Sequence, residues 1–533
     1  MSSIGPDLNL INVILSAIPI LVLIGTILIF KWSGPKAGAV SWLAVVFIAL
    51  VFFGSDIQLI ALATSKGLSL SLFVLTIIWT SVILYNVIDE IGGIKVIGLT
   101  ITRIVGDPLM QALIVGWAFS GFMQGIAGFG VPVAVVSPLL VLMGFSLARA
   151  ASIVLIGHAW AVTFGSLGSS FFTIQLVTGI EDNIIGPHMA ILFALPIILT
   201  GFAVAHLQGG IESIRRGFTV IIVMGFAMSI SVWILATIGA PQIASIVPGL
   251  VGCAIGWILS KSPLLNKSKK STKLAGQNSD IETNKSSTKL QNFHFAFLPY
   301  YLLLILSILS QIPTIKELSY TWHWGLDYPA TETALGFSVS AVENYGKIRF
   351  LAHPAPLIIM SLIFTYLTLK FSRRWENGAM LRAIKKTYFQ SSSTSVGVVT
   401  MVMMSLIMTD TGMTHLLSKT IADGTGPLFG LFSPFIGVLG TFVTGSNTNS
   451  NILFGALQIE TARSLGLNTV TVASIQSIGG SLGSAIAPAK VLVGTTIVGL
   501  SGRENEVLKR TIPYCLGIVF LVGLQAWIIL NLL

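Results

Sequence analysis

Charged residues are scarce in this chain. Only 9% of its 533 residues are Asp, Glu, Lys or Arg, whereas a soluble globular protein carries roughly 25%. Cysteine is also rare, because Cys253 and Cys515 are the only two and both lie inside apolar runs. We therefore expect neither a disulfide framework nor a cysteine metal site. The composition excludes a water-soluble enzyme and a disordered chain.

Apolar residues, in contrast, make up 54% of the chain, and its mean hydropathy is +0.88. Apolar runs recur that are long enough to cross a hydrocarbon layer of about 30 Å. The predicted fold is an all-α polytopic membrane protein with about 12 transmembrane helices plus two helical hairpins in two inverted repeats. The spans are predicted near 8–30, 37–54, 68–88, 147–165, 187–207, 217–240, 243–260, 295–313, 354–371, 391–409, 466–485 and 512–533.

Three regions follow from this pattern. Residues 1–260 form an N-terminal membrane half with a hairpin at 109–144, and residues 293–533 form a C-terminal half with a hairpin at 428–462. Residues 261–292 form a Lys-rich linker between them. Basic residues gather in the loops of one predicted side, which the positive-inside rule assigns to the cytoplasm. Both termini are therefore predicted outside the cell.

The two halves share sequence landmarks. The pentapeptide Gly-Ser-Leu-Gly-Ser occurs at Gly165–Ser169 and again at Gly480–Ser484, 315 residues later. Gly128 and Gly445 interrupt the two hairpins at nearly the same separation. We expect each half to hold a hairpin and a helix that ends in the pentapeptide. Interrupted helices at matched positions of inverted halves are typical of secondary transporters.

The interruptions themselves suit a small anion. Gly128, Phe129 and Gly130 break the first hairpin, and a run of short polar side chains breaks the second. Helix N-termini at such breaks offer free N–H donors and a positive dipole end, which favour a carboxylate. The glycines could instead serve close helix packing, whereas the polar run is costly to bury unless water or ligand meets it. The candidate substrate-binding residues are Gly128, Phe129 and Gly130 of the first break and Ser446, Asn447, Thr448, Asn449 and Asn451 of the second.

Three ionisable residues lie at depth in the predicted membrane region. Lys490 could pair with a substrate carboxylate or extend its ammonium to the interface. His158 could relay protons, since its charge changes near physiological pH, or bond to a neighbouring helix. Asp410 could carry a proton or simply end a span in water. We therefore assign Lys490 to substrate binding and His158 and Asp410 to proton coupling, and we expect no cofactor and no metal.

Two segments resemble a known family. The segment from Gln124 to Val135 is similar to a signature of the bacterial L-lactate permease family, and so is the segment from Pro434 to Asn451 with the following Leu453-Phe454. The resemblance implies uptake of lactate, and often glycolate, by proton symport across a bacterial plasma membrane. It also implies an ion-transporter architecture of inverted repeats with paired hairpins.

The chain departs from this family at three places. The family usually has Glu where this chain has Gln124, and Asp is common where it has Asn447. Family members often read Ser-Pro-Gln where this chain reads Ala-Pro-Ala-Lys at 487–490. Two potential carboxylates are thus replaced by amides, and a lysine stands nearby.

The predicted function is secondary active import of L-lactate or a similar small 2-hydroxy monocarboxylate, such as glycolate, by proton symport. Its partners would be the carboxylate anion, a proton and the bilayer, without nucleic acid. An alternative is a sodium-coupled carboxylate symporter, because Ser446-Asn447-Thr448 resembles sodium-site motifs of dicarboxylate transporters. A membrane-embedded enzyme is less favoured, since no motif pairs a nucleophile with a base.

Overall fold

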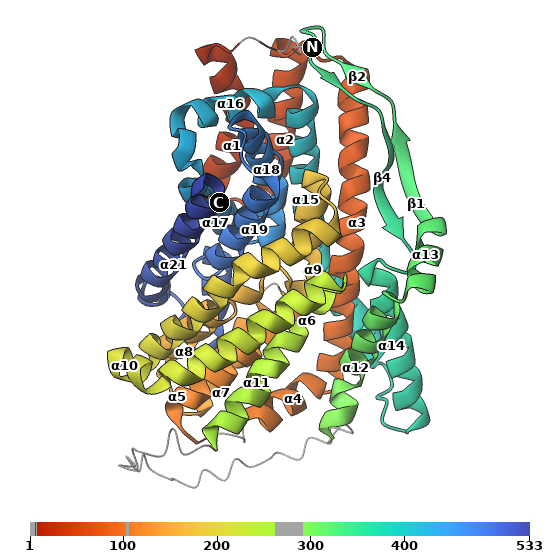
Figure 1. Ribbon diagram of the computed structural model, residues 1–533. Coiled ribbons are helices and arrows are strands. Elements are labelled where there is room, and N and C mark those ends of the chain that lie inside the picture. The colour runs from red at the N-terminus through yellow and green to blue at the C-terminus, as the bar shows by residue number, and fades with distance from the viewer. Residues whose placement is uncertain (1–5, 7, 103–105, 129, 262–291, 533) are drawn as a thin grey trace.

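The computed structural model describes residues 6, 8–102, 106–128, 130–261 and 292–532. The candidate Phe129 and almost all of the predicted linker therefore lie outside the described residues. Helices fill most of the molecule (Figure 1). Those of the first half are α1 (Leu10–Leu28), α2 (Gly34–Phe52), α3 (Ile57–Glu90), α4 (Gly93–Thr102), α5 (Pro108–Gln111), the π-helix η1 (Ala112–Phe119), α6 (Ser120–Ile126), α7 (Val131–Leu142), α8 (Leu147–Gly157), η2 (Ala159–Ala161), α9 (Gly165–Thr178), α10 (Asp182–Thr237), η3 (Pro241–Ile243) and α11 (Ile246–Ser260).

The second half repeats much of this order. Its helices are α12 (Phe293–Leu309), α13 (Pro313–Thr321), α14 (Pro354–Phe371), α15 (Ala379–Asp410), α16 (Met413–Thr425), η5 (Gly426–Leu428), α17 (Phe429–Thr444), α18 (Asn447–Ser464), α19 (Thr469–Gly483), α20 (Pro488–Ile497) and α21 (Glu504–Leu532). In both halves a long helix is followed by a short helix, a hairpin, a broken helix and a further long helix. The inverted relation between the halves stays a prediction.

The helices are long and apolar enough for a membrane. Within the described ranges, 10 helices could cross a bilayer, or up to 12 if each of two bent pairs counts as one span. Many large apolar side chains are exposed on their outer faces, including Leu10, Phe47 and Phe371, as lipid contact requires. The prediction of an all-α multi-pass membrane protein is confirmed.

The helices α3 and α15 form an unbroken antiparallel pair. Lys66 near the start of α3 bonds to Asp410 at the end of α15, and Asn86 near the end of α3 bonds to Thr387 near the start of α15. Both helices are longer than the spans predicted at 68–88 and 391–409. The pair supplies a continuous wall next to the interrupted helices.

A small β-ribbon covers part of α3. The sequence analysis did not predict its strands. Strands β1 (His323–Tyr328) and β4 (Val342–Arg349) pair antiparallel, and β2 (Thr331–Glu332) pairs with β3 (Ser338–Val339). Figure 1 shows β1 and β4 running alongside α3. Gly346 permits this approach, because its φ is +66° and a Cβ there would lie 3.1 Å from the backbone of Ser69.

The spans predicted at 187–207 and 217–240 correspond to the two segments of α10, which a kink at Gly209 and Gly210 separates. One local prediction needs correction. The first pentapeptide does not end a helix as predicted, although the second lies at the end of α19 as expected. Ser166, Leu167 and Gly168 have positive φ values of 48°, 56° and 81°. The chain bends by 48° between the segments Leu147–Ala161 and Gly165–Thr178, and regular helical geometry resumes only after Gly168.

Candidate functional site

The first hairpin breaks between α6 and α7. Ala127 is extended, with φ −149° and ψ 129°, and Gly130 is left-handed, with φ +84°. Pro132 lies in the first turn of α7, where its missing N–H has no intrahelical partner to lose. A Cβ on Gly128 would lie 2.3 Å from Oγ of Ser166. Glycine at 128 therefore lets this break pack directly against the break between α8 and α9.

The second hairpin breaks between α17 and α18. Gly445 is left-handed, with φ +75°, and Ser446 is extended and caps α18. The backbone N–H of Asn449 donates to Oγ of Ser446 at 3.4 Å. Thr444 completes the turn, because its hydroxyl donates to the carbonyl of Ser446 at 3.1 Å. Serine at this position satisfies one of the free amides of the helix N-terminus.

The polar run of α18 divides into two faces. Asn447 donates from Nδ2 to Thr163 and to the carbonyl of Ser477 at 3.0 and 3.2 Å. Asn451 donates to the carbonyl of Ser170 and to Oγ of Ser477, both at 3.0 Å. These bonds tie the start of α18 to α9 and α19, so this face positions the hairpin. Thr448 belongs to it as well, through its hydroxyl bond to Ser170 at 2.9 Å.

The other face meets a cavity that both breaks share. The cavity has a volume of about 410 Å³, within the range of small-molecule sites. Ala127 and Val131 border it from the first hairpin, and Ser446 and Asn449 border it from the second. Its remaining lining residues are Gly34, Pro35, Val82, Tyr85, Gln390, Ser391, Ser393, Thr394, Gly397, Met401, Thr444, Gly445, Ala489, Lys490 and Val493.

Lys490 is the charged side chain of this cavity. It lies in the first turn of α20 and is only 6% exposed. Among the described residues, no hydrogen bond or ion pair engages its ammonium, and no Asp or Glu lines the cavity. A buried cation beside a helix N-terminus, without an acid, favours an anionic ligand.

Gly130 is not among the lining residues, although a Cβ there would lie 3.3 Å from Val493, which lines the cavity. The structure thus brings Ser446, Asn449 and Lys490 to one cavity. Gly128 and Asn447 do not line the cavity. Gly128 packs against Ser166, and Asn447 bonds to Thr163 and Ser477.

The two residues assigned to proton coupling lie elsewhere. His158 is fully buried at the end of α8, with its Nδ1 2.7 Å from the carbonyl of Val154. It does not line the cavity. Asp410 also lies off the cavity wall, so proton coupling through either residue stays a prediction.

Asp410 is not a solvated span end. Its carboxylate accepts from Nζ of Lys66 at 2.9 Å, and the two side chains are only 6% and 4% exposed. The β-ribbon covers this pair, because the hydroxyl of Tyr328 bonds to Ser69 at 2.7 Å and to Ser65 at 3.0 Å. The contact forms a buried ion pair between α3 and α15.

Tyr345 of the ribbon lies in the same buried region as Asp410 and Tyr328. Burial and the nearby carboxylate of Asp410 raise the pKa of Tyr345, and Tyr328 adds to the effect. Its phenol is therefore neutral at physiological pH.

A family model for L-lactate permease matches residues 12–533. The chain belongs to the L-lactate permease family. It is 26% identical to an L-lactate permease of Halalkalibacterium halodurans over 97% of both chains. It is 26% identical to one of Bacillus subtilis, over 97% of this chain and 96% of the relative. It is also 25% identical to the glycolate permease GlcA of Escherichia coli K12, over 98% of this chain and 97% of the relative.

Membership in the L-lactate permease family places the chain with transporters. Within the described residues, no group of three or more His, Cys, Asp or Glu side chains could hold a metal ion. The resemblance drawn from the two hairpin motifs is confirmed. The family match does not assign individual binding residues.

Sequence reasoning missed the wall contributed by α3 and α15. Tyr85 comes from α3, and Gln390, Ser391, Ser393 and Thr394 come from α15. The signal was present, because residues 391–395 read Ser-Ser-Ser-Thr-Ser at the start of the span predicted at 391–409, directly after Gln390. This is the same kind of dense polar run that pointed to residues 446–451. It was overlooked because α15 is not interrupted.

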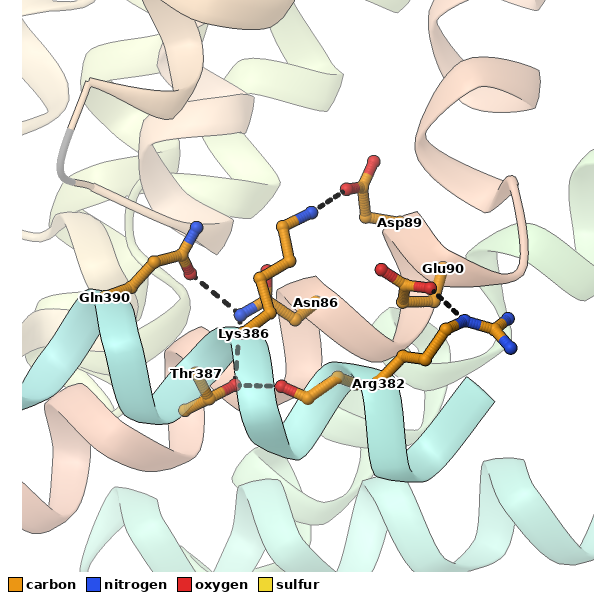
Figure 2. Close-up of polar contacts among 8 residues, drawn as sticks. Asn86, Asp89, Glu90, Arg382, Lys386, Thr387 and Gln390 are labelled. Atoms are coloured by element: carbon orange, nitrogen blue, oxygen red, sulfur yellow. Dashed lines mark hydrogen bonds and ion pairs between the residues drawn. The ribbon is translucent and has the colours of Figure 1, made fainter. Parts of the chain in front are cut away.

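A polar network borders this wall at the end of α3. Figure 2 shows Asn86 between Thr387 and Gln390, with bonds of 3.0 and 2.8 Å. The same view shows Lys386 reaching Asp89 and Arg382 reaching Glu90, at 2.6 and 2.8 Å. Gln390 belongs both to this network and to the cavity. The network therefore fixes one edge of the site.

A second cavity, of about 360 Å³, lies at the start of α10 and α14. It combines the acids Glu181 and Asp182 with the cations Lys347 and Arg349. None of the residues proposed from the sequence lies there. Its mixed charge makes it less suited to a lone anion than the cavity at Lys490.

Proposed function

We propose that this chain imports L-lactate or a similar small 2-hydroxy monocarboxylate, such as glycolate, by proton symport across a bacterial plasma membrane. The observation that carries the proposal is the cavity between two helix breaks, with Lys490 as its charged group. The carboxylate would meet the ammonium and the free amides at the start of α18 and α20. The hydroxyl and amide groups of Ser446, Asn449 and Thr394 would bind the 2-hydroxyl group.

The names of the relatives support the substrate class. Two of the relatives above are L-lactate permeases and one is a glycolate permease. Lactate and glycolate share a carboxylate with a neighbouring hydroxyl, and they differ by one methyl group. A site built on these shared groups would accept both acids.

We propose a cytoplasmic location for the basic loops, with both termini outside. Lys261, Arg382 and Lys386 follow or begin helices at the ends that the positive-inside rule assigns to the cytoplasm. Labelling of single cysteines introduced near residue 8 and residue 377 would test this. The proposal requires the first to react with an impermeant reagent in intact cells and the second to stay protected.

Uptake into vesicles tests the transport proposal. Purified protein in liposomes should accumulate labelled lactate when the outside is acidic, in the absence of sodium. Ser446→Ala and Asn449→Ala should reduce this uptake, because both side chains line the cavity. Gln458→Ala, which removes a buried amide off the cavity wall, controls for general damage to α18. Uptake that is independent of the pH gradient would refute proton coupling.

A specific group of oxygens supports sodium coupling as the second candidate. Oδ1 of Asn447 and Oγ1 of Thr441 are buried and have no hydrogen-bond partner in the part of the chain that the structure describes. Both face Gly480, where a Cβ would lie 2.0 and 3.0 Å from them. Neutral oxygens are ligands that hard cations accept. If sodium is required, replacing it with N-methylglucamine should stop uptake, and Thr441→Val should raise the sodium concentration needed.

A further inference from the structure

The charge balance of the cavity is unusual. Lys490 is the only charged group among its lining residues, and Tyr85 is the only other titratable one. The stretch of α15 from 390 to 401 adds hydroxyls and an amide but no acid. The occupied site therefore has one cation to balance one monocarboxylate.

The elements packed against α20 do not supply a counter-ion. These elements are α7, α8 and α21. Helix α7 has no titratable residue. Helix α8 carries Arg149 and ends at His158, whose ring is subject to the charge of Lys490. Both can only add positive charge.

Helix α21 has acids, but they are engaged away from the cavity. Glu504 accepts from the backbone of Gly502 at 2.8 Å and from Thr495 near the end of α20. Glu506 bonds to Arg503. Its further titratable groups are Lys509, Arg510, Tyr514 and Cys515. Tyr514 bonds to His206, and the thiol of Cys515 donates to the carbonyl of Leu482. No acid of these helices lines the cavity beside Lys490.

The protonation state that is favourable for Lys490 depends on whether the cavity is empty or occupied. Burying an unpaired charge is costly, so the empty site favours the neutral amine. When a carboxylate enters, the ammonium and the anion compensate each other and the charged form becomes favourable. We infer that Lys490 is the proton carrier of this permease, taking up one proton as the carboxylate binds and releasing it as the carboxylate leaves.

This inference rests on the proposed function and deepens it. The amine of Lys490 gains one proton and the site gains one anion, so the loaded site is neutral overall. After release of both, the empty site is neutral again. One proton therefore moves with each monocarboxylate. Neither His158 nor Asp410 needs to titrate, and Asp410 already has Lys66 as its partner.

Lys490→Arg tests the inference, because an arginine keeps the charge and does not release its proton. We expect the variant in liposomes to exchange external for internal lactate at equal pH, at a reduced but measurable rate. We expect it to lose accumulation driven by an inward proton gradient. Lys490→Gln should weaken both activities at least about tenfold, because the anion loses its charged partner.

Lys370→Arg is the matched control, since Lys370 lies over the ring of Tyr366 and outside the cavity. It should retain both activities. Gradient-driven accumulation by Lys490→Arg at the wild-type level would overturn the inference. If wild-type protein exchanges neither lactate nor glycolate, the proposed substrates are wrong.

Proton uptake on binding separates the two failures. Short carboxylates, namely acetate, propionate, lactate, glycolate and pyruvate, are added to unbuffered purified protein with a pH indicator. Wild type should take up one proton for each bound anion, and Lys490→Arg should take up none. Binding without proton uptake in the wild type would overturn the role of Lys490 alone. The absence of binding to any of these acids would overturn the proposed substrates, and the inference with them.

Discussion

Lys66 and Lys490 are two buried lysines in opposite situations. Lys66 lies 2.9 Å from the carboxylate of Asp410, beneath the β-ribbon. Lys490 lies in a cavity without an acid on its wall. Both side chains are at most 6% exposed, so burial alone does not distinguish them. Their partners do.

The presence or absence of an acidic partner distinguishes a lysine that stabilises the fold from one that is available to a ligand. The charge of Lys66 is permanently compensated within the protein, and it fixes α3 to α15. The charge of Lys490 can be compensated only from outside the described chain, by whatever enters the cavity. A buried ion pair contributes little net stability but is costly to break. A buried lone amine avoids the cost of an uncompensated charge by staying neutral until an anion enters the cavity.

The largest expected effect is on the Lys66 side of this comparison. Asp410→Asn should lower the free energy of unfolding by about 3–5 kcal/mol, because it leaves the ammonium of Lys66 buried and uncompensated. Thermal unfolding in detergent measures the loss. The double variant Lys66→Met with Asp410→Leu should recover most of it. An Asp410→Asn protein as stable as wild type would remove the contrast.

The same variant also tests the predicted proton role of Asp410. If Asp410 is structural, folded Asp410→Asn protein, prepared at low temperature, should keep the wild-type pH dependence of uptake. A shifted pH profile would return Asp410 to the coupling mechanism.

Lys490→Met should not lower the stability of the empty protein, in contrast to Asp410→Asn. Removal of a lone buried amine should leave the melting temperature of the empty protein unchanged or raised. The dissociation constant for the carboxylate should increase at least about tenfold, since the anion loses its cation. Calorimetry and ligand-dependent melting measure the two quantities. A large drop in the stability of the empty protein would show that Lys490 has a partner in the fold.

Asn449 and Asn451 offer the same contrast between two neutral side chains of α18. Asn449 lines the cavity, and Asn451 bonds within the fold. Asn451→Ala should cost about 1–3 kcal/mol of stability, because it removes two buried hydrogen bonds, one to the carbonyl of Ser170 and one to Oγ of Ser477. Asn449→Ala should reduce lactate uptake with a smaller loss of stability, because Asn449 lines the cavity. Equal stability losses in the two variants would contradict the division of α18 into two faces.

Lys386 should give the smallest effect. It bonds to Asp89 at 2.6 Å, but the two side chains are 37% and 34% exposed. Solvent screens such a pair, so Lys386→Gln should cost only about 0.2–1 kcal/mol. Added salt should reduce that difference further. A loss as large as that of Asp410→Asn would mean that the cavity edge is drier than the structure shows.

The sequence predicted the elements that depend on local pattern. Apolar runs located the membrane helices, and glycine with short polar residues located both hairpin breaks. The polar run 446–451 led to Ser446 and Asn449 because burying such residues without a partner is costly. Lys490 was likewise identified as a charge at depth.

What the sequence could not supply were the contacts between distant segments. Lys66 and Asp410 are separated by 344 residues, and no periodicity predicts which acid meets which lysine. The two faces of residues 446–451 also depend on where α9 and α19 pack. The strands of the β-ribbon were missed because residues 323–349 lack a strong alternating pattern and gain order from contact with α3.

The antiparallel pair of α3 and α15 is tied along its whole length. Lys66 and Asp410 join one end, Trp79 donates to Ser395 in the middle at 2.9 Å, and Asn86 bonds to Thr387 at the other end. Three side-chain contacts at different heights therefore resist sliding of α3 past α15. In the proposed transport cycle, we expect the interrupted helices to move against this pair.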